Sequence, residues 1–247
     1  IHAENISQDI IEEISINGIE GLEVETMLLS VDEKGSRDPS ERISAGAAYT
    51  AILHLGFSPE SEIIKLEKFG RNGYCMQIPD NSRRQIESGT IVAGAPEVIA
   101  TGSPEHVIDE SLDHFDRISW SEDAGGYVCN ETYYRTLLAV SESEHPSTPV
   151  LFMHLPDETV IPISVQISVV SRISRFLCKR PHFEVASALV FDERHRILAC
   201  RRPPGDTWAG MWEFPGGKIE DRESSRDAII REINEELQIS IEPSHKI

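Results

Sequence analysis

Near the C-terminus, three glutamates stand at a spacing that could hold a metal ion. Glu232, Glu235 and Glu236 occupy positions i, i+3 and i+4 of the segment 224–237, which carries a helical pattern. On a helix this spacing puts the three carboxylates on one face. Carboxylates this close repel one another unless a cation lies among them, and oxygen ligands without His or Cys favour Mg²⁺ or Mn²⁺. A solvated acidic helix face is the ordinary alternative.

Further residues at fixed spacing around these glutamates favour the metal site. Glu223 follows Gly217 after five residues, and Arg231 follows after seven more. The segment 217–239 resembles the Nudix box, whose pattern is G-x5-E-x7-R-E-U-x-E-E-x-G-U, where U is aliphatic. It departs from the pattern at the last glycine, which is Gln238 here. Because that glycine ends the helix, we expect an altered helix exit.

The resemblance extends upstream over Arg201-Arg202 and the segment 212–220, which look like the MutT branch that clears oxidised nucleoside triphosphates. It implies that water attacks a phosphorus atom while divalent metal ions neutralise the diphosphate. For Arg202, an exposed hairpin position is the alternative. The implied roles are metal ligation for Glu232, Glu235 and Glu236, a metal-linked or orienting carboxylate for Glu223, support of the carboxylates by Arg231, and phosphate contacts for Lys218 and Arg202.

A cysteine, a histidine and a carboxylate that are distant in sequence form a second candidate set. Cys129 follows a glycine pair and opens a predicted helix at 130–140, where a thiol faces the positive end of the helix dipole and its thiolate is stabilised. His154 follows a predicted strand at 149–153, and Glu67 lies shortly before the I-P-D-N stretch. Taken singly, these residues fit a core thiol, a loop histidine and a surface charge. Together they could serve as nucleophile, base and orienting carboxylate.

In this order and with these neighbours, the three residues are similar to those of pyroglutamyl peptidase I, a family of cysteine peptidases that remove an N-terminal pyroglutamate. The family stretches E-R-x-A-x-N, I-P-D-N, S-x-x-A-G-x-Y-x-C-N and F-x-H-x-P have counterparts here, and the resemblance spans roughly 5–176. It implies that Cys129 is the nucleophile, His154 the general base and then acid, and Glu67 the group that orients the imidazole. Backbone N–H groups at the helix start would bind the oxyanion.

Two departures from this family bear on activity. Gln77 stands where the family has an arginine before I-P-D-N, and a neutral amide stabilises charge less than a guanidinium. The chain also starts after the position of the family's first strand and its Gly-Phe-rich loop.

Alternating strands and helices are expected to position the first set. This alternation favours an α/β fold, a three-layer αβα domain with a mostly parallel sheet, in which functional groups collect at the carboxyl ends of strands. Apolar spacing also predicts a last helix that Pro181 ends. The predicted strands are 51–55, 90–93 and 149–153, and the predicted helices are 5–16, 130–140 and 163–177.

A compositional boundary near Lys179 divides the chain. Residues 1–179 carry a net charge of −16, whereas residues 180–247 carry −3. We expect a pyroglutamyl-peptidase-like domain at 1–179, lacking the family's first strand and loop. We expect the N-terminal half of a Nudix α/β/α domain at 180–247, opening with a hairpin around 192–195.

Composition excludes several classes of protein. Acidic residues number 42 against 23 basic ones, giving a net charge of −19, so nucleic acid scaffolds and acidic membranes are not expected as partners. No apolar run reaches eighteen residues and no signal-peptide pattern opens the chain. The four cysteines form no C-x-x-C pair, which fits a reducing compartment. We therefore expect a cytoplasmic protein.

The two sets together predict a two-domain hydrolase. One activity is a pyrophosphohydrolase that uses Mg²⁺ or Mn²⁺ and takes nucleoside di- or triphosphates, oxidised dNTPs included. The other is a cysteine peptidase that takes N-terminal pyroglutamyl peptides. A non-catalytic regulatory protein, with a pseudo-peptidase and a nucleotide sensor, is the alternative, and an artificial join of two genes is a third. Homo-oligomerisation is left open.

Overall fold

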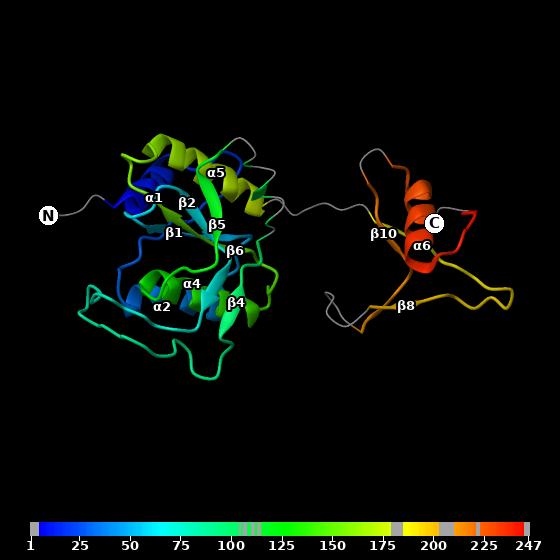
Figure 1. The fold of residues 1–247 in the computed structure, drawn as a ribbon, viewed down its shortest axis with the longest axis horizontal. Helices are drawn as coiled ribbons and strands as arrows, with labels where there is room; N and C mark the ends of the chain where they lie inside the picture. The colour runs from blue at the N-terminus through cyan, green and yellow to red at the C-terminus, as the bar shows by residue number, and fades with distance from the viewer. Residues whose placement is uncertain are drawn as a thin grey trace. The chain divides into compact units, whose positions relative to one another are not determined.

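The chain forms two compact units, Ile1–Lys179 and Arg180–Ile247 (Figure 1). The expected boundary near Lys179 lies outside the residues that the structure describes. The computed structural model describes residues 5–103, 105, 108–109, 112, 115–178, 185–202, 210–220 and 223–244.

A four-stranded sheet in the order β1-β6-β2-β5 forms the middle of the first unit. β1 pairs with β6 and β2 pairs with β5 in parallel, whereas β6 and β2 are antiparallel. The expected mostly parallel sheet is therefore confirmed. The strands are β1 (Ile52–Phe57), β2 (Ile64–Glu67), β5 (Ile118–Ser121) and β6 (Val150–Leu155), and β3 (Phe69–Arg71) and β4 (Val98–Ala100) form a separate antiparallel ribbon.

Helices cover both faces of this sheet (Figure 1). α1 and α5 pack with the sheet in one hydrophobic cluster, and residues of α2 and α4 pack in another. The helices are α1 (Ile6–Asn17), α2 (Glu33–Ser44), α4 (Val128–Ser141) and α5 (Ile163–Cys178). The three-layer αβα arrangement is confirmed, and three of these helices were predicted from apolar spacing.

The helix α2 was not predicted, because its buried face is mostly small. Its buried residues include Gly35, Ser36 and Pro39 besides Ile43, so no run of large apolar side chains marks the helix. Asp32 begins it by accepting a hydrogen bond from the Gly35 N–H at 2.9 Å.

The predicted strand at 90–93 is wrong, and the segment is an irregular loop. The Asn72 side chain takes the place of a strand partner. Its Oδ1 accepts from the Val92 N–H, and its Nδ2 donates to the Val92 carbonyl, both at 2.8 Å. Ile91 is buried all the same, which explains the apolar pattern.

Alternation along β6 decides which side chains can reach the helix that carries Cys129. Leu151, Met153 and Leu155 pack in the cluster with α1 and α5, while Phe152 packs in the cluster with α4. His154 follows Phe152 by two residues and therefore lies on the same face of the sheet. The ring of Phe152 contacts the ring of His154 at a centroid distance of 4.8 Å.

The described part of the second unit contains short antiparallel strand pairs and a helix. β7 pairs with β10, β8 pairs with β9, and a bridge between Phe191 and Ile197 closes the predicted hairpin. Ile229 and Ile233 anchor the helix by burial. The elements are β7 (Val185–Ser187), β8 (Cys200–Arg201), β9 (Trp212–Glu213), β10 (Gly216–Lys218) and α6 (Ser225–Leu237).

The exit of α6 differs from our expectation. Gln238 adopts the left-handed conformation, with φ 55° and ψ 31°, and its N–H bonds the Asn234 carbonyl. The helix therefore ends with the backbone conformation that a terminal glycine would adopt. Because Gln238 has a Cβ atom, this conformation is strained.

Replacing Gln238 with glycine is expected to stabilise the second unit by about 1 kcal/mol, because glycine adopts positive φ without a Cβ penalty. Hydrogen exchange of the buried Ile229 and Ile233 amides should slow accordingly. Gln238→Ala is the control, since alanine keeps the Cβ. Equal exchange in the glycine and alanine variants would contradict the prediction.

None of the helices among the described residues is both long and apolar enough to cross a membrane.

Candidate active sites

The fold of the first unit brings Glu67, Cys129 and His154 together. Glu67 ends β2, His154 lies near the end of β6, and Cys129 lies in the first turn of α4. The Nδ1 atom of His154 is 2.8 Å from Oε1 of Glu67, across 87 residues of sequence. The Cys129 side chain lies close enough to His154 to raise the pKa of this ring. His154 thus lies between Cys129 and Glu67, which is where a base between a nucleophile and an orienting carboxylate is expected.

The carboxylate of Glu67 is fully buried. Its main-chain carbonyl accepts a hydrogen bond from the Tyr133 hydroxyl at 2.8 Å, which ties the end of β2 to α4. Oε2 has no hydrogen-bond partner among the described residues. The His154 ring is thus the group that compensates this buried charge.

The imidazole of His154 has a strongly shifted pKa. Burial by itself lowers this pKa, but hydrogen bonds and charge from Cys129 and Glu67 outweigh burial and raise it to about 9. The ring is therefore protonated at neutral pH. A protonated imidazole beside a sulfur atom is the partner that stabilises a thiolate nucleophile.

The raised pKa of His154 predicts a pH-dependent stability. The folded value, about 9, lies above the ordinary value of 6.5, so the contribution is complete below pH 6.5 and is lost as the pH rises through 9. The loss amounts to at most about 3 kcal/mol. Urea unfolding of the full chain between pH 6.5 and 9.5 measures it. Glu67→Gln should flatten the dependence, and a stability that rises over this window would refute the prediction.

A glycine on the neighbouring strand makes room for the thiol. Gly56 pairs with His154 in the parallel register of β1 and β6. A Cβ atom at Gly56 would lie 2.8 Å from the Phe152 ring and 3.2 Å from the sulfur of Cys129. The sequence alone did not mark this glycine, although its place near the end of a strand is a usable signal.

The start of α4 offers backbone donors. Tyr127 is its N-cap residue and makes no capping hydrogen bond through its side chain. The N–H groups of the first turn lack carbonyl partners within the helix and are suited to an anionic oxygen. Gln77 is exposed, and its side-chain amide donates to the sulfur of Cys75 at 3.3 Å.

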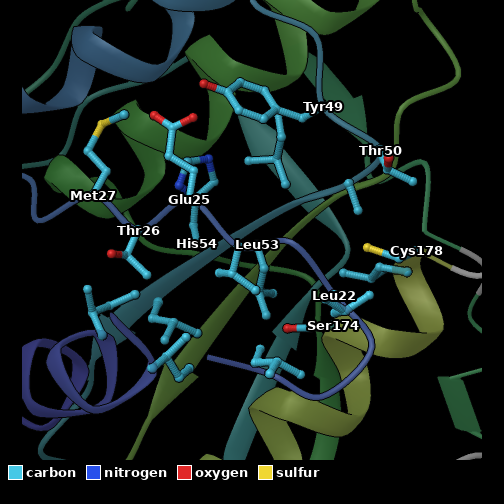
Figure 2. Close-up of a pocket in the computed structure, with 18 of the residues that line it drawn as sticks. Leu22, Glu25, Thr26, Met27, Tyr49, Thr50, Leu53, His54, Ser174 and Cys178 are labelled. Carbon is cyan, nitrogen blue, oxygen red and sulfur yellow. The ribbon is translucent and has the colours of Figure 1, made fainter. Parts of the chain in front are cut away.

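A cavity of about 460 Å³ lies beside β1, away from this set (Figure 2). Its lining includes the segment from Gly21 to Met27 and His54. Burial lowers the pKa of His54 to about 4, so this ring is neutral at pH 7. Glu67, Cys129 and His154 are not among the lining residues.

In the second unit, Arg231 gathers the box carboxylates. Its guanidinium donates to both oxygens of Glu223 at 2.9 Å and to Oε1 of Glu232 at 2.9 Å. It also reaches Glu235 at 3.4 Å and the Lys218 carbonyl at 3.0 Å. The guanidinium hydrogen bond lowers the pKa of the Glu223 carboxyl.

Two observations place Glu232 and Glu236 next to the strand β10. A Cβ atom at Gly217 would clash with the carboxyl group of Glu232, which would have to move to make room for it. Burial raises the pKa of Glu236, opposed by a hydrogen bond from the Gly216 backbone, and the charges of Glu232 and Glu213 raise it further.

The donor chemistry of this unit fits a hard divalent cation, because carboxylate oxygens are its preferred ligands. Within the described part of the chain, however, no three carboxylate, imidazole or thiol side chains are gathered as a metal site. Glu232 and Glu235 face Arg231 instead. Arg202 donates to Glu213 at 2.8 Å, and Lys218 is exposed.

Comparison with known proteins decides the family. The model described as pyroglutamyl peptidase matches residues 2–170. The chain belongs to the pyroglutamyl peptidase family. The model described as NUDIX domain matches residues 181–247, so both domains belong to hydrolase families.

Individual relatives agree with both matches. Pyrrolidone-carboxylate peptidase of Coprothermobacter proteolyticus is 28% identical over 153 residues, which is 62% of this chain and 73% of that protein. The crystal structure of pyrrolidone carboxyl peptidase from Thermus thermophilus has a TM-score of 0.61 and 26% identity over 70% of this chain and 92% of that one.

The second domain matches a shorter stretch of its relatives. 8-oxo-dGTP diphosphatase of Proteus vulgaris is 37% identical over 57 residues, which is 23% of this chain. The chain spans about half of that protein, 51% of its length.

Proposed function

We propose that the first domain hydrolyses the amide bond that follows an N-terminal pyroglutamate. The observation that carries this proposal is the buried contact of 2.8 Å between Glu67 and the His154 ring, whose pKa the nearby Cys129 side chain also raises. A histidine held between a carboxylate and a thiol is the arrangement of cysteine peptidases.

In this proposal the sulfur of Cys129 attacks the carbonyl carbon of the amide bond that follows the pyroglutamyl ring, and the lactam carbonyl of the ring does not react. The negative charge that develops on the carbonyl oxygen is stabilised by N–H groups at the start of α4. His154 gives its proton to the leaving amine, and the C–N bond breaks to leave a thioester on Cys129. His154 then takes a proton from water, which hydrolyses the thioester and frees pyroglutamate.

A chromogenic pyroglutamyl amide tests this activity in the full chain. We expect release of the chromophore by the wild type, and no release from the corresponding prolyl amide, which has no lactam carbonyl. Failure of the wild type to release chromophore from the pyroglutamyl amide would leave the domain as a scaffold and overturn the proposal.

We propose that the second domain hydrolyses a nucleoside di- or triphosphate. Support comes from the convergence of Arg231 on the box carboxylates and from the match to 8-oxo-dGTP diphosphatase. Glu232, Glu235 and Glu236 would hold Mg²⁺ or Mn²⁺, which when bound neutralises the charge of the diphosphate. Glu223 and Arg231 would orient these carboxylates, and Lys218 and Arg202 would contact the phosphates.

Turnover of 8-oxo-dGTP and of unmodified nucleotides, with and without Mg²⁺, tests the second activity. We expect metal-dependent release of pyrophosphate. Two observations favour the alternative of a nucleotide-binding regulatory protein: Gln77 in the first domain and the contacts of Glu232 and Glu235 with Arg231 in the second. Calorimetric binding of nucleotide without turnover would support that alternative.

A further inference from the structure

A long segment, 72–97, connects β3 to β4 (Figure 1) and contacts the turn before the helix that carries Cys129. Two bonds join it to the turn before that helix. The Cys75 N–H donates to the Gly126 carbonyl at 2.9 Å, and the Tyr127 hydroxyl donates to the Pro79 carbonyl at 3.1 Å. A Cβ atom at Gly126 would lie 2.5 Å from the backbone nitrogen of Cys75. The stretch 75–79 therefore contacts the turn that leads into α4, immediately before Cys129.

One buried carboxylate on α4 binds this segment. Glu131 lies two residues after Cys129, and its side chain is fully buried. It accepts a hydrogen bond from the Tyr74 hydroxyl at 2.8 Å and one from Nη2 of Arg84 at 2.6 Å. Arg135, one turn further along α4, donates to it at 3.0 and 3.1 Å.

The partners of Glu131 lie on both sides of the stretch 75–79. Tyr74 precedes the stretch directly. Arg84 follows it, and Arg84 is itself held by Asp80, with Nε 2.8 Å from Oδ2. Residues on both sides of the stretch are therefore held by hydrogen bonds. On each side, these bonds lead to the carboxylate of Glu131.

The charge of Glu131 is what makes this anchor strong. Burial by itself raises its pKa, but hydrogen bonds from Arg84, Tyr74 and Arg135 lower the pKa below its usual value, so the group is ionised. Two guanidiniums, Arg84 and Arg135, are balanced by the two carboxylates of Glu131 and Asp80. Loss of the Glu131 charge would leave a buried guanidinium without its counter-charge, which is strongly unfavourable.

We propose that Glu131 and Arg84 are positioning residues of the peptidase site. They hold the stretch 75–79 against the start of α4. The backbone of this stretch then forms one wall of the space in which the pyroglutamyl group meets the sulfur of Cys129. This inference rests on the proposed peptidase function. Neither residue contacts the reacting atoms, and both act through the position of this wall.

Glu131→Gln tests the proposal, because glutamine keeps the shape and removes the charge. We expect KM for the pyroglutamyl amide to rise by about tenfold or more while kcat changes by less than about threefold, since the wall is displaced and the Glu67–His154–Cys129 contacts remain. Hydrogen exchange of the Met76 and Asp80 amides, which bond carbonyls within the segment, should accelerate about tenfold, and exchange of β6 should not change. Glu142→Gln, at the exposed end of the same helix, is the matched control.

Several results would overturn the proposal. They are an unchanged KM together with unchanged exchange, a loss confined to kcat, or exchange that accelerates equally in β6. If Glu131→Gln does not fold, Arg84→Gln must show the same rise in KM and the same local exchange, because Arg84 is the partner on the segment. If the wild type cleaves no pyroglutamyl amide, the proposed function fails. The exchange rates alone then decide whether Glu131 holds the segment.

Discussion

Replacing Cys129 with serine is expected to lower turnover of a pyroglutamyl amide by at least about a thousandfold. The side chain lies in the first turn of α4 and close to the His154 ring, whose pKa is raised to about 9. Serine removes the thiol that helps to raise the pKa of this ring, and a hydroxyl loses its proton far less readily than a thiol, so the variant lacks an activated nucleophile.

The measurement is chromophore release by the full chain at pH 7 to 8. Cys178→Ser is the matched control, since this thiol ends α5 and lies on the lining of the cavity beside β1 (Figure 2). The control should keep wild-type turnover. Turnover by Cys129→Ser within about tenfold of the wild type would show that another group is the nucleophile.

Glu235→Gln is expected to lower metal-dependent nucleotide turnover by at least about a hundredfold, because loss of a ligand charge weakens both metal binding and neutralisation of the diphosphate. The side chain is 60% exposed, and its contact with Arg231 is long, 3.4 Å. An exposed ion pair contributes little to stability, so the variant should fold. The effect will therefore report on chemistry rather than on folding.

The measurement is pyrophosphate release across a series of Mg²⁺ concentrations in the full-length protein. Glu242→Gln removes an exposed acid that follows α6 and is the control. If Glu235→Gln shows wild-type turnover at all Mg²⁺ concentrations, Glu235 is not a ligand of the metal. A variant that recovers at high Mg²⁺ would identify a weakened metal site.

Apolar spacing predicted the elements whose buried side is made of large side chains. β1, β6, α1, α4 and α5 are of this kind, and the structure contains all of them. The same criterion missed α2, whose buried positions are Gly35, Ser36, Pro39 and Ile43. It was misled at 90–93, because Ile91 is buried in a loop that the Asn72 amide holds. A sequence pattern shows that a residue is buried, but not which group satisfies its backbone.

The site residues also differ in whether a local sequence pattern or only the contacts of distant segments reveals them. Sequence order and neighbouring residues were enough to single out Glu67, Cys129 and His154. The roles of Tyr133 and Glu131 were not visible, because both are helical residues that bind groups far away in the chain, at Glu67 and at Tyr74. Their hydroxyl and carboxylate acquire a role only from the strands and loops that the fold brings to them.

The sequence by itself determined the chemistry that each domain has available: a thiol, an imidazole and a carboxylate in one, and a row of carboxylates with an arginine in the other. It also determined both families, since the order and spacing of these residues survive without coordinates. Only the tertiary structure decided that Glu67 is buried against His154, that the raised pKa of this ring makes it an acid at neutral pH, and that Arg231 gathers the box glutamates. The physical reason is that burial, hydrogen bonding and charge pairing depend on contacts between distant segments, and no local pattern in the chain encodes their distances.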